Sequence, residues 1–148
     1  MLNPVKSGIL VPILILAPNA LFLFLPPLTP SRNQAVPFML MVAENIGRIG
    51  TLLIPVFYTF SFKRRFTASA LTVAATALLI YYTAWARYFV DGRTNELMAA
   101  PLLGIPIPLA VAPVIFLLAS AYLLVSWPLA AAAVWFGIFH IWITAFTL

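Results

Sequence analysis

The chain has 148 residues, of which 64% are hydrophobic and 7% are charged, whereas about 25% of an ordinary soluble domain is charged. So few polar residues cannot cover a soluble globule, and we expect one domain of membrane-spanning helices in contact with the lipid bilayer over residues 1–148. The net charge is +5, but the basic residues lie at or between apolar runs, which indicates membrane orientation and argues against nucleic acid as a partner. Cysteine is absent, which excludes disulfides and thiolate metal sites.

Three apolar runs near the length that a membrane helix needs, roughly 20 residues, occupy the first part of the chain. They cover residues 7–28, 36–62 and 67–90. A proline-rich stretch follows the first run, and the charged turn 63–65 separates the second run from the third. The first run is longer than the core of a signal peptide and has no small-x-small pattern after it, so we expect a retained helix.

The apolar sequence of residues 101–148 is too long for one span, at about 1.5 Å per residue against a core of about 30 Å. The best break is residues 126–128, because Pro128 can open a helix and Trp127 favours the lipid interface. We therefore expect helices at 105–125 and 129–147, and a polytopic all-α bundle of five helices in total. Four prolines disturb the fourth helix, so four helices plus a re-entrant segment are the alternative.

The Lys and Arg residues near the predicted helix ends divide unequally between the two sides of the membrane. Lys6 and residues 63–65 fall on the side of the N-terminus. The other side holds three basic and two acidic residues, namely Arg32, Arg87, Arg93, Asp91 and Glu96. Because the cytoplasmic side usually holds more cations, we expect the N-terminus in the cytoplasm and the C-terminus outside.

The second predicted helix contains two charged residues within its apolar sequence. Burying a charge at the centre of a spanning helix costs about 2.5–3.5 kcal/mol, so Glu44 and Arg48 need an explanation. Their spacing of four places them on one face, where they can form an ion pair, and Asn45 adds an amide beside them. Two interpretations stay open: the pair only stabilises helix packing, or it lines a binding site or path.

Two stripes run along the third predicted helix. A polar stripe recurs at spacings of three, four and seven, and we expect it to face the interior of the bundle. It consists of Ser69, Thr72, Thr76, Thr83 and Arg87. An aromatic stripe, Tyr81, Trp85 and Tyr88, either packs on neighbouring helices and the outer interface or contacts a ligand.

The first and last helices each contribute one polar residue of interest. Asn19 follows Pro18, which leaves a backbone carbonyl near Ile15 without its normal donor, and Asn19 can help to satisfy it. His140 lies on a face of small and polar residues that favours close helix approach. A single histidine in such a position is usually a hydrogen-bonded core residue.

We place each helix midpoint at the membrane midplane and use a rise of about 1.5 Å per residue. Asn19, Glu44, Arg48 and His140 then fall between the middle and the outer half of the membrane. Arg87 lies nearest the outer surface, and we expect it to reach Glu44 or a bound anion. Prolines of the fourth helix lie at the same level, so we predict a polar pocket in the outer half of the bundle. Its predicted ligand-binding residues are Glu44, Asn45, Arg48, Arg87, His140, Asn19, Tyr81 and Trp85.

Three segments, residues 44–48, 81–93 and 106–111, resemble small polytopic bacterial membrane proteins that have no established activity. This resemblance implies a bacterial inner-membrane setting. It implies no functional residue.

Three functions stay open. The first is binding or transport of a small polar or anionic molecule, with Arg48 and Arg87 attracting the ligand and a homo-oligomer forming any path. The second is an intramembrane enzyme with Glu44 as acid or base, although no nucleophile elbow or phosphate loop is present. The third is an accessory subunit whose polar residues only fix helix packing.

We expect no cofactor. One histidine and three acidic residues are a poor basis for a metal or bis-histidine haem site. The chain also lacks the glycine fingerprint of nicotinamide and flavin sites.

Overall fold

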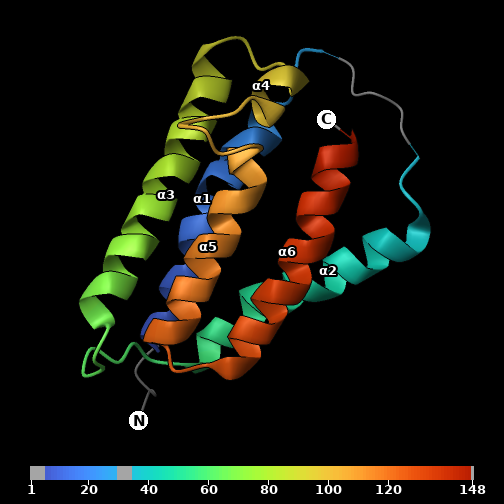
Figure 1. The fold of residues 1–148 in the computed structure, drawn as a ribbon. Coiled ribbons are helices and arrows are strands. Elements are labelled where there is room, and N and C mark those ends of the chain that lie inside the picture. Colours follow the sequence, from blue (N-terminus) through green and yellow to red (C-terminus); the bar gives the residue numbers. More distant parts are fainter. Residues whose placement is uncertain (1–5, 30–34, 148) are drawn as a thin grey trace.

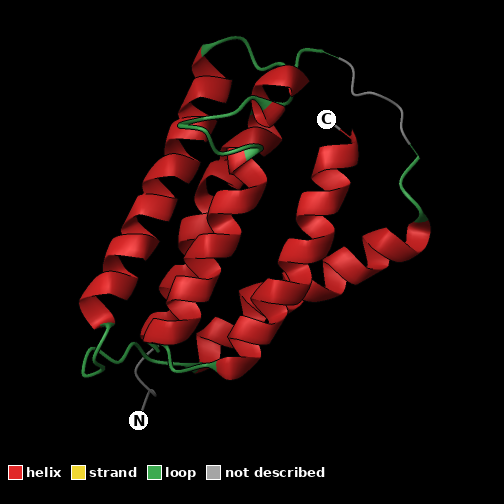
Figure 2. Ribbon diagram, viewed as in Figure 1, coloured by secondary structure: helices red, strands yellow, loops and turns green. Residues whose placement is uncertain are grey.

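The structure is a computed structural model that describes residues 6–29 and 35–147, and in this part of the chain every regular element is a helix (Figures 1 and 2). The predicted all-α bundle is confirmed, and four helical segments are long and apolar enough to cross a membrane: Ser7–Phe24, Phe38–Phe57, Thr67–Val90 and Trp127–Thr147. Arg32 lies outside the described residues. The α-helices are α1 (Leu10–Phe24), α2 (Phe38–Leu53), α3 (Thr67–Val90), α4 (Asn95–Ala99), α5 (Pro108–Leu123) and α6 (Trp127–Thr147), with 3₁₀ helices η1 (Ser7–Ile9) and η2 (Ile54–Phe57).

The bundle is built around α5, which packs between α3 and α6 and also contacts α1. Helix α2 crosses α6 obliquely, and its N-terminal end projects from the bundle (Figure 1). The two ends of the chain lie at opposite ends of the bundle (Figure 1). Most residues of α5 are buried, among them Phe116 and Leu117, so this helix forms the centre of the apolar core.

Glycines allow α6 to approach its two neighbours closely. A Cβ atom on Gly47 of α2 would lie 2.8 Å from the Cα of Phe136, and one on Gly137 would lie 2.8 Å from a methyl group of Val114 in α5. Both distances are shorter than carbon atoms tolerate, so only glycine fits at these crossings. The predicted close approach along the His140 face of α6 is therefore confirmed.

The second helix is shorter than predicted. We expected residues 36–62, but α2 and η2 together end at Phe57. Pro55 supplies no N–H group to continue the α-helix. The chain beyond it is extended, and its backbone bonds to other segments: Ser61 N donates to Leu123 O at 2.8 Å, and Gly8 N donates to Tyr58 O at 3.0 Å.

The break in the last apolar stretch is confirmed, because α5 ends at Leu123 and α6 begins at Trp127. The start of the fourth long helix is later than predicted, at Pro108 instead of residue 105. Residues 100–107 form an irregular segment in which Leu103 and Ile107 have positive φ angles. Helix α5, with 16 residues, is thus shorter than the four membrane-length segments, which have 18–24 residues, and proline-rich irregular backbone leads into it.

The predicted orientation of α3 is wrong. The hydroxyl side chains Ser69, Thr72, Thr76 and Thr83 all lie on exposed positions. The aromatic stripe faces inward instead: Tyr81, Trp85 and Tyr88 are buried and form edge-on pairs with one another. An exposed threonine can satisfy its hydroxyl on its own helix, as Thr72 does by donating to Ala68 O at 3.0 Å, so its polarity does not force it inward.

Candidate functional site

Three polar side chains meet where α2 crosses α6. Arg48 Nη2 lies 2.5 Å from Oε1 of Glu44, and Nδ1 of His140 lies 2.7 Å from the same oxygen. The Glu44 side chain is 10% exposed, whereas the Arg48 side chain is 47% exposed. One buried carboxylate therefore joins an arginine on its own helix to a histidine on another.

Each partner of Glu44 keeps hydrogen-bonding capacity to spare. A guanidinium has five N–H groups, and only the bond from Nη2 to Glu44 uses one of them within the described part of the chain. The His140 ring stacks on Phe136, with ring centroids 4.6 Å apart. Because Nδ1 of His140 faces the carboxylate, Nε2 is the ring nitrogen left for another partner.

A cavity of about 390 Å³ lies beside this cluster. Arg48 and His140 line it, together with Asn19 of α1 and Thr144 of α6. Most of the remaining wall is apolar and comes from α1, α3, α4 and α5; it includes Ile15, Trp85, Met98, Leu109, Pro113 and Leu117. Met98 and Leu109 belong to the end of the bundle where α4 lies, so the cavity extends from the middle of the bundle towards that end (Figure 1).

The wall on the α1 side is built around a proline. Pro18 has no N–H group, so the carbonyl of Leu14 lacks its usual helix donor, and the hydroxyl of Tyr82 donates to it at 2.8 Å. Asn19 Nδ2 donates to Ile15 O at 2.8 Å and to the Tyr81 hydroxyl at 2.8 Å. Asn19 does bond to the Ile15 carbonyl, as predicted, but the carbonyl that Pro18 leaves without a donor is that of Leu14, and Tyr82 satisfies it instead of Asn19.

The aromatic wall contains a polar atom without a partner. The indole nitrogen Nε1 of Trp85 is buried, and no hydrogen-bond acceptor for it is found in the described residues. Trp85 packs edge-on against Phe22, with ring centroids 5.5 Å apart. Because Trp85 also lines the cavity, a ligand in the cavity is one source of an acceptor for this N–H group.

Three of the predicted ligand-binding residues are absent from the cavity lining, namely Arg87, Asn45 and Glu44. Arg87 does not reach Glu44: its guanidinium donates to the carbonyls of Ala100 at 2.6 Å and Pro101 at 3.1 Å. It therefore holds the irregular segment after α4 against the end of α3. Asn45 is exposed on α2 and is absent from the lining.

The cavity brings together the other five predicted residues, namely Asn19, Arg48, Tyr81, Trp85 and His140. Glu44 is not a lining residue, but its carboxylate contacts two of the five, Arg48 and His140. The prediction did not include Thr51 or Thr144, which also line the cavity. Helical spacing could have found both, because Thr51 lies three positions after Arg48 and Thr144 lies four positions after His140.

Comparisons with protein-family models, with curated proteins and with solved structures gave no match to this chain. The expected bacterial setting therefore stays a prediction, and any function has to be argued from the site itself.

Proposed function

We propose that this chain is a multi-pass membrane protein that binds a small polar or anionic molecule in the cavity beside Arg48. The observation that carries the proposal is an arginine on a mostly apolar cavity of about 390 Å³, with N–H groups that have no partner among the described residues. Pockets for small molecules are typically about 300–1,000 Å³, with apolar walls and a few polar groups that fix orientation. The cavity matches this description.

The distribution of polar groups suggests how a ligand would lie. Arginine presents a planar set of donors that fits a carboxylate or phosphate with two hydrogen bonds. His140 and Thr144 also line the cavity, and they lie one helical turn apart on α6. The ligand's polar head would bind there, and its apolar body would lie against Pro113 and Leu117 of α5.

The charge of the cluster favours an anion over a cation. Arg48 lines the cavity, whereas Glu44, which pairs with it, is not among the lining residues, so a ligand would meet a guanidinium first. A bound anion would compete with Glu44 for Arg48, so Glu44 would tune affinity as well as hold the arginine in place. A cationic ligand would meet Arg48 with no free carboxylate beside it.

We also propose a cell-membrane location, with the N-terminus in the cytoplasm. Lys6 lies close to the chain that follows η2, because its Nζ donates to Phe57 O at 2.7 Å, and the basic turn 63–65 follows that chain. Arg93 at the opposite end has Asp91 and Glu96 near it in sequence. The cation-rich end is expected on the cytoplasmic side, so the part of the cavity near α4 would lie in the outer half of the membrane.

Native mass spectrometry of the gently solubilised protein tests the proposed binding. We expect a reproducible small molecule bound to the wild-type chain and lost in Arg48→Gln. Arg93→Gln is the matched control, because it removes the same charge at a residue that does not line the cavity, and it should keep the ligand.

Two outcomes would contradict the proposal. One is a wild-type chain that carries no small molecule but copurifies with a different subunit, as an accessory role predicts. The other is a ligand that Arg48→Gln and Arg93→Gln retain equally, which would place binding away from this cavity.

A further inference from the structure

A groove with two hollows runs between α3 and α5, outside the candidate site. The hollow nearer the basic turn has a volume of about 300 Å³, and the next one has a volume of about 210 Å³. Val73 and Ile115 line both hollows, so the two form one continuous groove. None of the residues that line the cavity beside Arg48 lines this groove.

The groove has the dimensions and chemistry of a site for a hydrocarbon chain. On α3 it extends from Phe66, just before the helix, to Ile80, a distance of about 21 Å at 1.5 Å per residue. Its walls are almost entirely apolar, and small side chains such as Ala70 and Ala119 leave the space open. An acyl chain could lie along α3 without burying any charge.

One end of the groove carries a cluster of cations. The guanidinium carbon of Arg64 lies 4.2 Å from the centroid of the Tyr122 ring, and its Nη1 donates to Tyr122 O at 3.2 Å. Tyr122 lines the first hollow, so Arg64 is held at the rim of the groove. Lys63 and Arg65 are its neighbours in sequence and are exposed.

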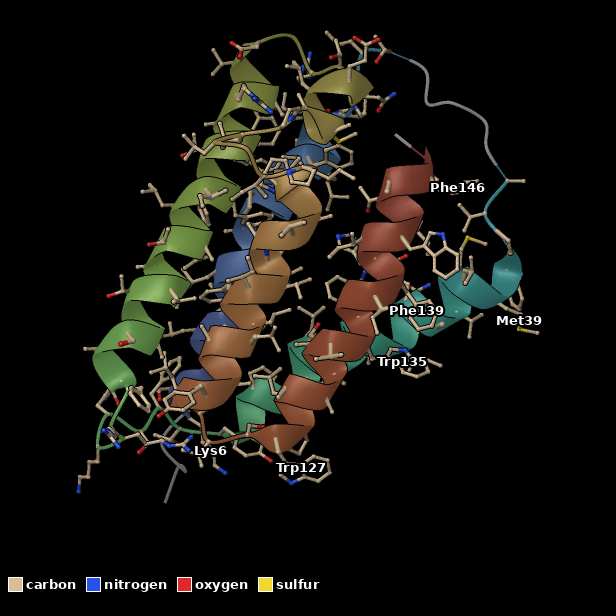
Figure 3. The ribbon with its side chains drawn as sticks, in the orientation of Figure 1. Lys6, Met39, Trp127, Trp135, Phe139 and Phe146 are labelled. Atoms are coloured by element: carbon tan, nitrogen blue, oxygen red, sulfur yellow. The ribbon has the colours of Figure 1, made fainter. Side chains whose placement is uncertain are left out.

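These cations have no anionic partner in the protein as far as the structure describes it. The ion pairs found among the described residues are those of Glu44 with Arg48 and with His140. This end of the bundle also carries Lys6 and the exposed Trp127 (Figure 3), and tryptophan favours the membrane interface. Three adjacent positive charges therefore face the depth at which lipid head groups lie.

We infer that the α3/α5 groove is a binding site for an anionic phospholipid. One acyl chain lies along the groove, and the phosphate binds the cations of residues 63–65, with Arg64 at the rim. Basic clusters at the cytoplasmic end of membrane helices attract anionic lipids, by about 1 kcal/mol for each Lys or Arg near the surface. This inference does not depend on the ligand proposed for the cavity.

Lipid competition tests the inference directly. The delipidated protein is mixed with equal amounts of phosphatidylglycerol and phosphatidylcholine that have identical acyl chains, and bound lipid is counted by native mass spectrometry. We expect selective retention of phosphatidylglycerol, and a loss of about five-fold in that selectivity for Arg64→Gln. Arg93→Gln, at the opposite end of the bundle, should leave the selectivity unchanged.

Two further sets of variants separate the head group from the groove. Ala70→Phe fills the first hollow and should reduce retention of both lipids. If Arg64→Gln lowers stability, Lys63→Gln and Arg65→Gln remove the neighbouring charges of the same cluster instead. Neither of these side chains has a hydrogen bond to the described protein, whereas Arg64 does. Equal retention of the two lipids by the wild type, or selectivity that survives all three charge removals, would overturn the inference, as would undiminished binding in Ala70→Phe.

Discussion

Oε1 of Glu44 lies 2.7 Å from Nδ1 of His140, although 96 positions separate the two residues in the chain. This contact joins α2 to α6 just where Gly47 lets the two helices approach closely. Trp135 of α6 adds a second polar link, because its Nε1 donates to Ala43 O at 2.7 Å. The polar residues of the candidate site therefore also stabilise the crossing on which the site is built.

The Glu44–His140 contact should appear as a coupling energy. We expect Glu44→Gln and His140→Leu to destabilise the fold singly, and the double variant to be more stable than the sum of the two losses predicts. The expected coupling is about 0.5–3 kcal/mol, the range for residues that share a polar network. Thermal unfolding of the four proteins in one detergent measures it, and additive losses would show that the contact contributes nothing.

The bond from Tyr82 to the Leu14 carbonyl should matter only because residue 18 is proline. Tyr82→Phe should cost about 0.5–1.5 kcal/mol, since it leaves that carbonyl without a donor. In a Pro18→Ala background, the restored backbone N–H takes over this role, and the same substitution should then cost almost nothing. Unfolding midpoints of the four proteins test this, and an equal cost in both backgrounds would refute the explanation.

The crossing of α2 and α6 should not tolerate a side chain at position 47. A Cβ atom there would meet backbone atoms of Phe136 at 2.8 Å, so Gly47→Ala should cost about 1–3 kcal/mol as overpacking does. Gly50→Ala is the matched control on the same helix, because its nearest neighbour is the Ala132 methyl group at 3.2 Å. The melting temperature should fall less for Gly50→Ala than for Gly47→Ala. A larger fall for Gly50→Ala would contradict the structure.

The proposed orientation can be tested with single cysteines, because the natural chain has none. Asp91→Cys and Phe62→Cys place exposed thiols at opposite ends of α3. A maleimide that cannot cross membranes should label Asp91→Cys in intact cells, and Phe62→Cys only after the cells are permeabilised. The opposite labelling pattern would place the N-terminus outside.

Local sequence signals determined much of this architecture. The lengths of the apolar runs predicted the helical bundle, and Ser126, Trp127 and Pro128 marked the turn between the last two helices. Both signals could be interpreted from sequence because each acts within a single helix or turn. The pairing of Glu44 with Arg48 also followed from spacing alone, since residues four apart share a helix face. The same applies to Asn19, whose partner at Ile15 lies one helical turn away.

Only the tertiary structure decided which helix faces meet. In lipid, a polar stripe does not have to point inward, because a hydroxyl can bond within its own helix, and so the threonines of α3 face outward while its aromatic residues fill the core. Arg87 had several acceptors within reach. Its guanidinium donates to the carbonyls of Ala100 and Pro101, which the irregular segment after α4 places beside it. Neither the contact of His140 with Glu44 nor the groove beside Arg64 is encoded in local spacing, because each depends on how distant helices pack.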